Sequence, residues 1–282
     1  MKYALIGKKG LLASAFAEAL AQKKASFQTF SQEEIDITNP DSLKRLAPFA
    51  IWINCAAYTN VSLAEKEKTQ AWSLNVEGPK NLAKAARQYQ AKLIHFSTDY
   101  VFDGKKRAPY EEHDLASPLN VYGLTKYEGE KAALLLHEKT LVIRTSWLFS
   151  LEKPCFLTKI FAAADKKKPL FVVDDQKGRP TYVHDLVEAT FLLEQDEGMI
   201  HFANRGACSW YAFAKEALLM KQNGNPTKGC AEIHPISSEN QEVMRPAYSV
   251  LSTKAFETKY AHILDWKDVL RRARAKQPRA DQ

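Results

Sequence analysis

Up to residue 145 the chain alternates short apolar runs with stretches in which apolar residues recur every three or four positions. The apolar runs predict strands at Tyr3–Ile6, Phe27–Phe30, Ile51–Ile53, Leu93–Phe96 and Leu141–Arg144. The helical spacing predicts helices at Leu11–Lys23, from Asn39-Pro40-Asp41 onward, at Trp72–Arg87 and at Tyr122–Leu136. Strands and helices that alternate in this way form a parallel sheet with helices on both faces. The pattern therefore predicts an α/β fold with a doubly wound parallel sheet.

The alternation loosens after Trp147. Helices are predicted at Phe156–Ala164, Val183–Leu193, Trp210–Lys221 and Trp266–Arg274, with a Gly/Asn/Pro loop at Asn223–Gly229. We expect residues 1–150 to form the sheet domain and residues 151–282 a smaller α/β lobe. The chain is expected to return to the sheet around residues 170–198, with Phe171–Val173 as the returning strand.

Charge and composition exclude several classes of protein. The 282 residues are 45% hydrophobic and 26% charged, as in an ordinary globular protein. No apolar run exceeds five residues, whereas a membrane span needs about 20. The net charge is +7, but residues 267–282 carry +4 of it, so the rest is nearly balanced. We expect no membrane or nucleic-acid partner and interpret the tail as a solvated, frayed helix, with a basic binding patch as the alternative.

The four cysteines are Cys55, Cys155, Cys208 and Cys230, and they form neither a CxxC motif nor a metal-ligand spacing. They are interpreted as reduced thiols of a cytoplasmic protein. The first glycine follows only four apolar residues, fewer than the roughly 7–15 of a signal-peptide core.

A glycine-rich turn, Gly7-Lys8-Lys9-Gly10-Leu11-Leu12-Ala13, joins the first strand to the first helix. Only 11 residues of the chain are glycine, so two within four positions are informative. In a dinucleotide-binding turn such glycines permit the bend and let the backbone approach the pyrophosphate at the helix N-terminus. Its GxxGxxA spacing predicts a Rossmann-like nucleotide site, the alternative being a plain strand-to-helix turn.

The phosphate state of the cofactor is suggested by the end of the second strand. NAD-specific sites place an acid there, but Thr29-Phe30-Ser31-Gln32 has no carboxylate before Glu33. Lys8 and Lys9 are placed to attract a 2′-phosphate. We therefore expect NADP(H) to be preferred and NAD(H) to be the alternative, since two solvated lysines explain the same pattern.

Tyr122 and Lys126 are the candidate acid–base pair. Residues four apart share one helix face, and a neighbouring cation is expected to lower the pKa of a phenol toward a useful range. The same spacing occurs at Tyr127/Lys131 and Tyr211/Lys215, so context decides between them. Only Tyr122 opens a long helix shortly after the hydroxyl pair Ser97-Thr98, which ends an apolar strand where parallel sheets bind ligands.

Several motifs together resemble the extended short-chain dehydrogenase/reductase superfamily. They are GxxGxxA, Asn54-Cys55-Ala56-Ala57, the STDYVFDG block at 97–104 and the NVYGLTK block at 120–126. Further blocks are similar to the dTDP-4-dehydrorhamnose reductase family: RTSW at 144–147, DQKGRPT at 175–181, SWY at 209–211 and RPAYS at 245–249. The similarity runs from residue 1 to about residue 270.

The resemblance implies that hydride from NAD(P)H reduces the C4 carbonyl of a nucleotide-linked 4-keto-6-deoxy sugar, most simply dTDP-4-dehydrorhamnose. Thr98 and Tyr122 would hold that carbonyl, Tyr122 would supply the proton, and Lys126 would hold the nicotinamide ribose. The residues expected around the cofactor are Gly7, Lys8, Gly10, Leu11, Leu12, Ser31, Asp36, Ile37, Ala56, Ala57, Tyr58, Asn75, Ser97, Tyr122 and Lys126. Those expected around the substrate are Thr98, Asp99, Tyr100, Val101, Phe102, Trp147 and Arg245.

Tyr100 and Arg245 carry further implications of the resemblance. Related dehydratases carry Glu where this chain has Tyr100, which favours carbonyl reduction over elimination. Arg245 is the candidate for the substrate diphosphate, because a guanidinium matches phosphate oxygens; a surface arginine is the alternative. For Trp147 the alternatives are packing against the substrate and a place in the core.

Two departures from the family pattern define the remaining alternatives. Val61-Ser62-Leu63-Ala64-Glu65 replaces the usual V-D-K-A-E, and Ala15 and His184 stand where some relatives hold a subunit-bridging magnesium with glutamates. We therefore expect no metal, a monomer or weak homodimer, and His184 as a helix-start residue. The other functions are a cofactor-binding regulatory subunit without activity, as in methionine adenosyltransferase, and a reductase or epimerase of another nucleotide sugar.

Overall fold

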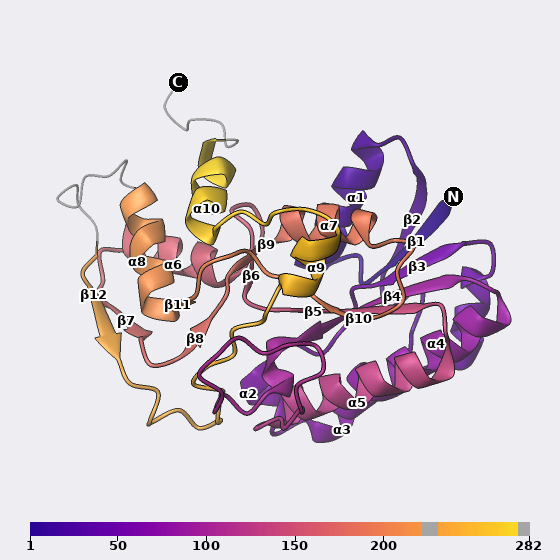
Figure 1. The fold of residues 1–282 in the computed structure, drawn as a ribbon, viewed down its shortest axis with the longest axis horizontal. Coiled ribbons are helices and arrows are strands. Elements are labelled where there is room, and N and C mark those ends of the chain that lie inside the picture. Colours follow the sequence, from indigo (N-terminus) through magenta and orange to yellow (C-terminus); the bar gives the residue numbers. More distant parts are fainter. Residues whose placement is uncertain (222–230, 276–282) are drawn as a thin grey trace.

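The computed structural model describes residues 1–221 and 231–275. The predicted loop Asn223–Gly229, Cys230 and the end of the basic tail lie outside these ranges. The predicted doubly wound sheet is confirmed: six parallel strands lie in the order β10-β5-β4-β3-β1-β2 (Figure 1). The strands are β1 (Lys2–Ile6), β2 (Ser26–Phe30), β3 (Ile51–Asn54), β4 (Lys92–Thr98), β5 (Thr140–Thr145) and β10 (Gly198–His201).

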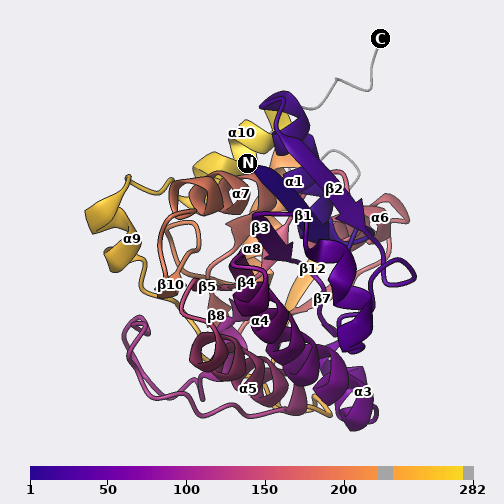
Figure 2. The same cartoon turned by 90° about the vertical axis from the view of Figure 1, so that its right-hand side faces the viewer.

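Helices cover both faces of this sheet. Figure 2 shows α1 (Leu11–Gln22) and α7 (Val183–Leu192) on one side and α4 (Gly78–Gln88) and α5 (Val121–Leu136) on the other. Each face has its own apolar core, the first around Phe16 and Leu186 and the second around Trp52 and Leu82. The central strands β3 and β5 are buried along their whole length between these helices, whereas the edge strand β2 has exposed residues.

Two predicted helices differ locally from expectation. Asn39 does cap the next element by accepting from the Asp41 amide, but the element is a 3-10 helix, η1 (Pro40–Leu46). The predicted helix Trp72–Arg87 is divided into α3 (Lys68–Trp72), a single π-turn η2 (Ser73–Glu77) and α4. Such π-turns are frequent at functional sites, and this one carries Asn75 inward.

The second lobe contains α6 (Phe156–Asp165), α8 (Trp210–Lys221), α10 (Trp266–Ala275) and three two-stranded sheets. The sheet pairs are β6 (Leu148–Phe149) with β9 (Thr181–Tyr182), β7 (Leu170–Val173) with β12 (Ile233–Ile236), and β8 (Lys177–Gly178) with β11 (Cys208–Ser209). Short helices α2 (Val61–Ala64) and α9 (Lys254–Lys259) and the 3-10 turn η3 (Asp99–Val101) complete the elements.

The predicted return of the chain through Phe171–Val173 is wrong. This segment is β7, which pairs with β12 in the second lobe, and Phe171 remains 65% exposed because the small sheet is covered on one side only. The chain returns instead through α7 and β10, which adds a strand beside β5. The chain therefore leaves the six-stranded sheet after β5 and joins it again at β10.

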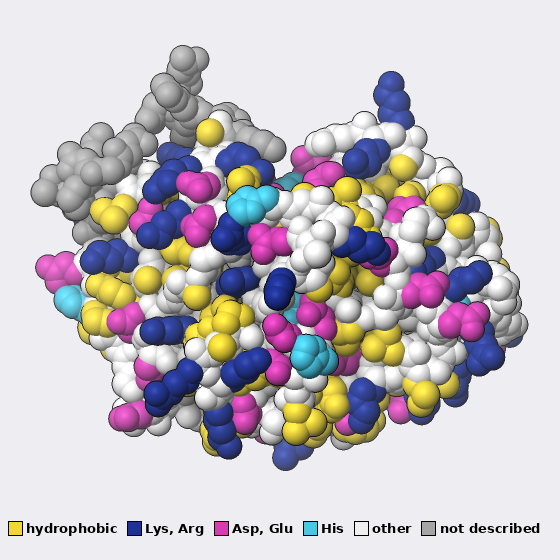
Figure 3. Space-filling view, viewed as in Figure 1, with side chains coloured by type: hydrophobic (Ala, Val, Ile, Leu, Met, Phe, Trp, Pro, Cys, Tyr) yellow, Lys and Arg dark blue, Asp and Glu magenta, His cyan; other side chains and the backbone are white. Residues whose placement is uncertain are grey.

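The two lobes meet along a segment that we call the seam, residues 244–252. The seam runs beside the loop after β4: Tyr110 pairs with Leu251, and a Cβ on Gly104 would lie 2.7 Å from the backbone of Pro246 and Ala247. Acidic and basic side chains are interspersed on the face in Figure 3. Within the described ranges, each helix is too short or too polar to cross a membrane.

Candidate active site

The glycine-rich turn forms a close backbone junction between β1 and β3. Gly7 has φ +98°, and a Cβ there would lie 2.9 Å from the amide nitrogen of Ala56. The Gly7 and Lys8 amides donate to the Phe30 carbonyl, and the Gly10 amide donates to the Gly7 carbonyl. Only glycine fits this position without strain. The turn thus leaves the N-terminus of α1 open at the point where the strand order reverses, the usual ligand position in such sheets.

A cavity of about 250 Å³ lies against this turn. Eight of the residues expected around the cofactor line it: Gly7, Lys8, Gly10, Ser31, Asp36, Ile37, Ala56 and Ala57. Lys9, which was expected to attract a 2′-phosphate, also lines the cavity. The other lining residues were not assigned to the cofactor: Ile6, Gln32, Glu33, Ile35, Cys55 and Leu74. Adjacency to a predicted residue was the available signal for five of them: Ile6 and Cys55 adjoin Gly7 and Ala56, and Gln32, Ile35 and Leu74 adjoin Ser31, Asp36 and Asn75.

The mouth of this cavity carries both signs of charge. Lys9 forms an exposed ion pair with Glu33 at 3.0 Å. A hydrogen bond from the Ser31 hydroxyl, its own backbone amide and the Lys9 ammonium lower the pKa of Glu33 to about 2. A carboxylate is therefore present three residues after the end of β2, immediately beyond Thr29–Gln32.

The side chain of Asn75 joins the loop after β3 to α5. Its side-chain oxygen accepts from the Tyr58 amide at 2.8 Å, and its side-chain nitrogen donates to the Tyr58 carbonyl at 3.0 Å and to the Thr125 hydroxyl at 3.1 Å. The Tyr58 hydroxyl donates to Glu67. A Cβ on Gly129 would lie 1.9 Å from the Asn75 carbonyl oxygen, so this glycine lets α5 approach the π-turn.

The remaining predicted cofactor residues differ in exposure. Leu11 begins α1, while Leu12 is buried in the core beneath it. Ser97 is buried on β4, and its hydroxyl has no hydrogen-bond partner in the described parts of the chain. A buried hydroxyl of this kind is available to a ligand.

Thr98 and Tyr122 are brought together as predicted. Thr98 ends β4 and hydrogen-bonds the Tyr122 hydroxyl from the first turn of α5. The Thr98 hydroxyl also lies 3.1 Å from an Asp99 carboxylate oxygen and accepts from the Tyr100 amide. Asn120 caps α5 by accepting from the Gly123 amide at 2.8 Å, which fixes the start of the helix at Val121 and places Tyr122 in its first turn.

The pKa of Tyr122 differs from the prediction. Burial raises it to about 12 against the opposing hydrogen bond from Thr98, and the carboxylate of Asp99 adds to the increase. The expected lowering by Lys126 does not occur, because the Lys126 ammonium donates instead to the Phe96 carbonyl at 2.6 Å. Burial lowers the pKa of Lys126 itself to about 8, opposed by Glu130. In the resting site Tyr122 is therefore a protonated donor.

Asp99 connects this pair to the second lobe. Burial raises the pKa of Asp99 to about 7, although hydrogen bonds from Ser249 and Thr98 favour its carboxylate. Beside it, the Tyr100 ring packs edge-on against Tyr122 with centroids 5.8 Å apart, and the Tyr100 hydroxyl hydrogen-bonds Arg245. Arg245 keeps a buried Nε without a partner among the described residues, so the seam presents a cation with spare donor capacity to the site.

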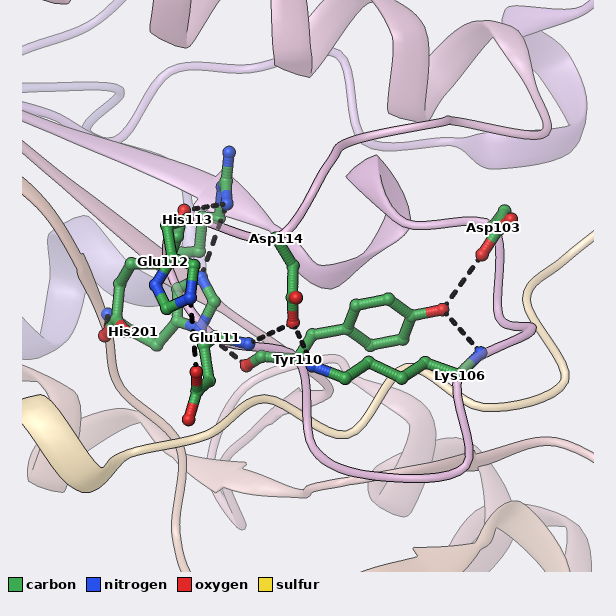
Figure 4. A network of polar contacts seen from close by, with 9 residues as sticks. Asp103, Lys106, Tyr110, Glu111, Glu112, His113, Asp114 and His201 are labelled. Carbon is green, nitrogen blue, oxygen red and sulfur yellow. Dashed lines mark hydrogen bonds and ion pairs between the residues drawn. The ribbon is translucent and has the colours of Figure 1, made fainter.

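Side chains of the loop between β4 and α5 bond to one another and to His201 on β10 (Figure 4). The Tyr110 hydroxyl donates to Asp103 at 2.9 Å and accepts from the Lys106 amide at 3.1 Å, and Lys106 pairs with Asp114. The Tyr110 carbonyl lies 3.2 Å from Nδ1 of His201 on β10. Together with the pairing of Tyr110 and Leu251, these contacts place the loop between β10 and the seam.

A buried ion pair supports this loop from below. Arg144 on β5 pairs with Glu130 on α5, both almost fully buried, and also donates to the Glu112 carbonyl. The Glu112 carboxylate in turn accepts from the His201 amide at 2.9 Å. Glu130 lies one helical turn beyond Lys126, so the pair fixes the face of α5 that carries Tyr122 and Lys126.

The predicted substrate residues occupy different environments. The side chains of Val101 and Phe102 are fully buried with Tyr110 and Leu251, where they hold the loop. The indole of Trp147 stacks on Trp210 with centroids 3.6 Å apart, and its backbone has φ +48°. Both tryptophans belong to the second-lobe cluster at the start of α8, and Trp147 is only partly buried.

The two positions compared with a magnesium site lie on α1 and α7. Ala15 is buried in the core, and His184 stands in the first turn of α7 with its ring 5.0 Å from that of Tyr182 and 3.6 Å from the Glu152 carboxylate. The described residues contain no group of three or more His, Cys, Asp or Glu side chains that is arranged to hold a metal ion.

Comparison with known proteins decides the family. The model of the RmlD substrate binding domain family matches residues 1–277. The chain belongs to this family. Among curated RmlD-family relatives, the dTDP-4-dehydrorhamnose reductase of Mycolicibacterium smegmatis is 34% identical over 95% of this chain and 84% of its own. A probable dTDP-4,6-dihydroxy-2-methyloxan-3-one 4-ketoreductase of Streptomyces antibioticus is 34% identical over 97% and 94% of the two chains.

Solved structures agree with this membership. The dTDP-4-dehydrorhamnose reductase of Bacillus anthracis, solved in complex with NADP, is 32% identical, covers 98% of this chain and 99% of its own, and has a TM-score of 0.92. The Thermus thermophilus UDP-glucose 4-epimerase, at 16% identity and a TM-score of 0.81, shares the fold. The resemblance inferred from the sequence motifs is thereby confirmed for the family.

Proposed function

We propose that this RmlD-family chain is an NAD(P)H-dependent oxidoreductase that reduces the C4 carbonyl of a dTDP-linked 4-keto-6-deoxy sugar, most simply dTDP-4-dehydrorhamnose to dTDP-rhamnose. The observation that carries the proposal is the contact between the Thr98 hydroxyl and the protonated phenol of Tyr122 at the carboxyl end of β4. Two hydroxyl donors at one point suit a carbonyl oxygen that becomes an alkoxide.

The cavity at the glycine-rich turn, about 250 Å³ in volume, suits the phosphate-bearing part of a dinucleotide. Gly7 admits close backbone approach, the amides at the start of α1 suit the diphosphate, and the unpartnered Ser97 hydroxyl and Lys126 remain for the nicotinamide half. When bound, the reduced nicotinamide supplies the hydride. Lys8 and Lys9 favour a 2′-phosphate and hence NADP(H), as in the B. anthracis relative. The Glu33 carboxylate is placed to accept a ribose hydroxyl, so NAD(H) is the second cofactor.

Thr98 and Tyr122 control the transfer of the phenol proton to the substrate. Thr98 and Tyr122 orient the carbonyl by donating to its oxygen, and the O–H bond of Tyr122 breaks as that oxygen becomes a hydroxyl. The high pKa of Tyr122 keeps the proton on the phenol until negative charge develops nearby. Tyr100 stands where an elimination catalyst would need a carboxylate, so the site reduces its substrate without dehydrating it.

The substrate diphosphate is assigned to Arg245, whose Nε lacks a partner in the described structure and whose guanidinium already touches Tyr100. Trp147 is assigned to the sugar. The S. antibioticus relative is named for a different dTDP-linked keto sugar, which makes a second sugar of this class the alternative substrate. Together, Thr98, Tyr122 and Lys126 favour an enzyme over an inactive regulatory subunit.

The deciding experiment measures NADPH oxidation with dTDP-4-dehydrorhamnose, followed by NMR of the product. Tyr122→Phe is expected to lower kcat by about 100-fold or more while NADPH affinity, measured by calorimetry, is retained. Tyr127→Phe removes a phenol from the same helix and is expected to leave both unchanged. Turnover by Tyr122→Phe at the wild-type rate contradicts the assignment. If the wild-type chain reduces no keto sugar and co-purifies with another protein, the regulatory alternative is favoured instead.

The chain is proposed to act as a monomer or weak homodimer. Support comes from Ala15, whose buried methyl cannot ligate a metal between subunits. Light scattering after gel filtration, with and without EDTA, is expected to give one mass. A larger, EDTA-sensitive species contradicts this proposal.

A further inference from the structure

Three buried polar side chains form a line beneath the catalytic helix. Asn54 ends β3, His95 lies opposite it in register on β4, and Lys126 projects from α5, each at most 3% exposed. Nothing in the proposed chemistry uses Asn54 or His95. Buried polar groups are costly unless each one is matched to a partner, so the hydrogen-bond direction along this line is informative.

The donor–acceptor direction of these hydrogen bonds is set at Asn54. The Ala56 amide can only donate, and it lies 3.1 Å from the Asn54 side-chain oxygen. The Asn54 side-chain nitrogen therefore faces Nδ1 of His95, 3.0 Å away, and donates to it. A ring nitrogen that accepts carries no proton, so neutral His95 must carry its proton on Nε2.

That proton points at Lys126. Nε2 of His95 lies 3.5 Å from Nζ, whereas an ammonium that bonds an acceptor stands about 2.7–2.9 Å away. The longer separation fits two donors that oppose each other. Burial and the neighbouring Lys126 hold the pKa of His95 well below its usual value, so the ring stays neutral.

We propose that His95 is a positioning residue for Lys126: held by Asn54 as the Nε2–H tautomer, it presents a donor to the amino group and favours release of a proton from the ammonium. The role of Lys126 itself rests on the proposed function. The other titratable or charged groups around the pair are Tyr122 and Glu130 on α5, with Arg144 bound to Glu130. Glu130 favours the ammonium, and His95 opposes it.

The consequence is a proton source one helical turn from Tyr122. When an N–H bond of Lys126 breaks, its proton passes to water and the nitrogen keeps the electron pair. The resulting amine accepts from Nε2–H of His95 and later takes a proton from water. With a carboxamide or apolar side chain at position 95, the ammonium form of Lys126 is more stable than in the wild type.

The first test is spectroscopic and needs no substrate. The full chain is labelled with ¹⁵N-histidine, and His95→Asn identifies the His95 signals. We expect an unprotonated Nδ1 and a protonated Nε2 from about pH 6 to 9. A protonated Nδ1, or an imidazolium in this range, overturns the proposal.

The second test follows Lys126 through ¹³C-labelled lysine, with Lys126→Met for assignment. His95→Asn keeps an acceptor for Asn54 but does not reach Lys126, and we expect about a tenfold gain in the proton affinity of Lys126. His95→Gln reaches Lys126 with an amide oxygen and is expected to give a larger gain. Unchanged titration in both variants overturns the proposal. Because neither readout involves the keto sugar, failure of the proposed substrate leaves both tests valid.

Discussion

Ser249 donates a hydrogen bond to the carboxylate of Asp99 across 150 residues of sequence. This contact joins the second lobe to the end of β4, directly beside the Thr98–Tyr122 pair. Asp99 is thus both a contact between the lobes and a buried acid beside Thr98 and Tyr122. The hydrogen bond from Ser249 favours its carboxylate form, whereas burial favours its protonated form.

The first prediction concerns stability and pH. Asp99 has a pKa of about 7 in the folded protein, above the value of about 4 in an unfolded chain. The folded state therefore holds this proton more tightly, and the stabilisation is complete below about pH 4 and is lost as pH rises through about 7. Asp99→Asn cannot ionise, so it is expected to gain about 2–4 kcal/mol relative to wild type between pH 4 and pH 8.

Urea unfolding at the two pH values measures this difference. Asp103→Asn serves as the control, because Asp103 is more accessible and its pKa is lowered. An Asp99→Asn effect that is the same at pH 4 and pH 8 would mean that Asp99 titrates normally.

The second prediction concerns the nucleotide turn. Gly7→Ala places a methyl group against the Ala56 backbone at a positive φ. It is expected to reduce NADPH affinity at least about tenfold and to destabilise the fold by about 1–3 kcal/mol. Gly198→Ala is the matched control, with φ +84° and no atom within 4 Å of the added Cβ. Both variants carry backbone strain, but only Gly7→Ala places a methyl group where the cofactor backbone contact is expected. Calorimetry of NADPH binding to both variants therefore separates the two effects.

The third prediction concerns the buried Arg144–Glu130 pair. Glu130→Gln leaves the guanidinium without its charged partner and is expected to cost about 3–5 kcal/mol. The double variant Glu130→Leu with Arg144→Met removes both charges and is expected to cost clearly less. Hydrogen exchange at Glu112 and Asp114 should rise in both variants, since Arg144 also supports that loop. A double variant that costs as much as Glu130→Gln or more contradicts this account.

The fourth prediction separates hydroxyl chemistry from packing at Thr98. Thr98→Val keeps the shape but removes the donor, and kcat is expected to fall about 10²–10³-fold. Thr98→Ser keeps the hydroxyl and is expected to stay within about tenfold of wild type. Single-turnover measurements with bound NADPH report the chemical step, and equal losses in the two variants would assign Thr98 to packing alone.

Five of the six strands of the sheet could be predicted from the sequence, but β10 could not. Apolar runs gave β1, β3, β4 and β5, because strands buried on both faces need continuous apolar residues. The same rule gave a wrong prediction at Phe171–Val173, which belongs to a two-stranded sheet. An apolar run predicts a strand but does not show which strand it pairs with. The cavity residues next to the glycine-rich motif followed from position alone.

What escaped prediction depends on contacts distant in sequence. The high pKa of Tyr122 arises from burial, which spacing on a helix does not report. Asn75 and Gly129 meet through a π-turn that reads as ordinary helix in the sequence. His95 looked like a single polar residue in an apolar strand, and only the register with Asn54 shows the line that leads to Lys126.

The late arrival of β10 affects how the chain folds during synthesis. The sheet remains one strand short until residue 201 has left the ribosome, and β5 meanwhile presents an unpaired edge. A nascent chain that stalls before this point exposes a surface prone to aggregation, and a truncation after residue 150 would make that exposure permanent.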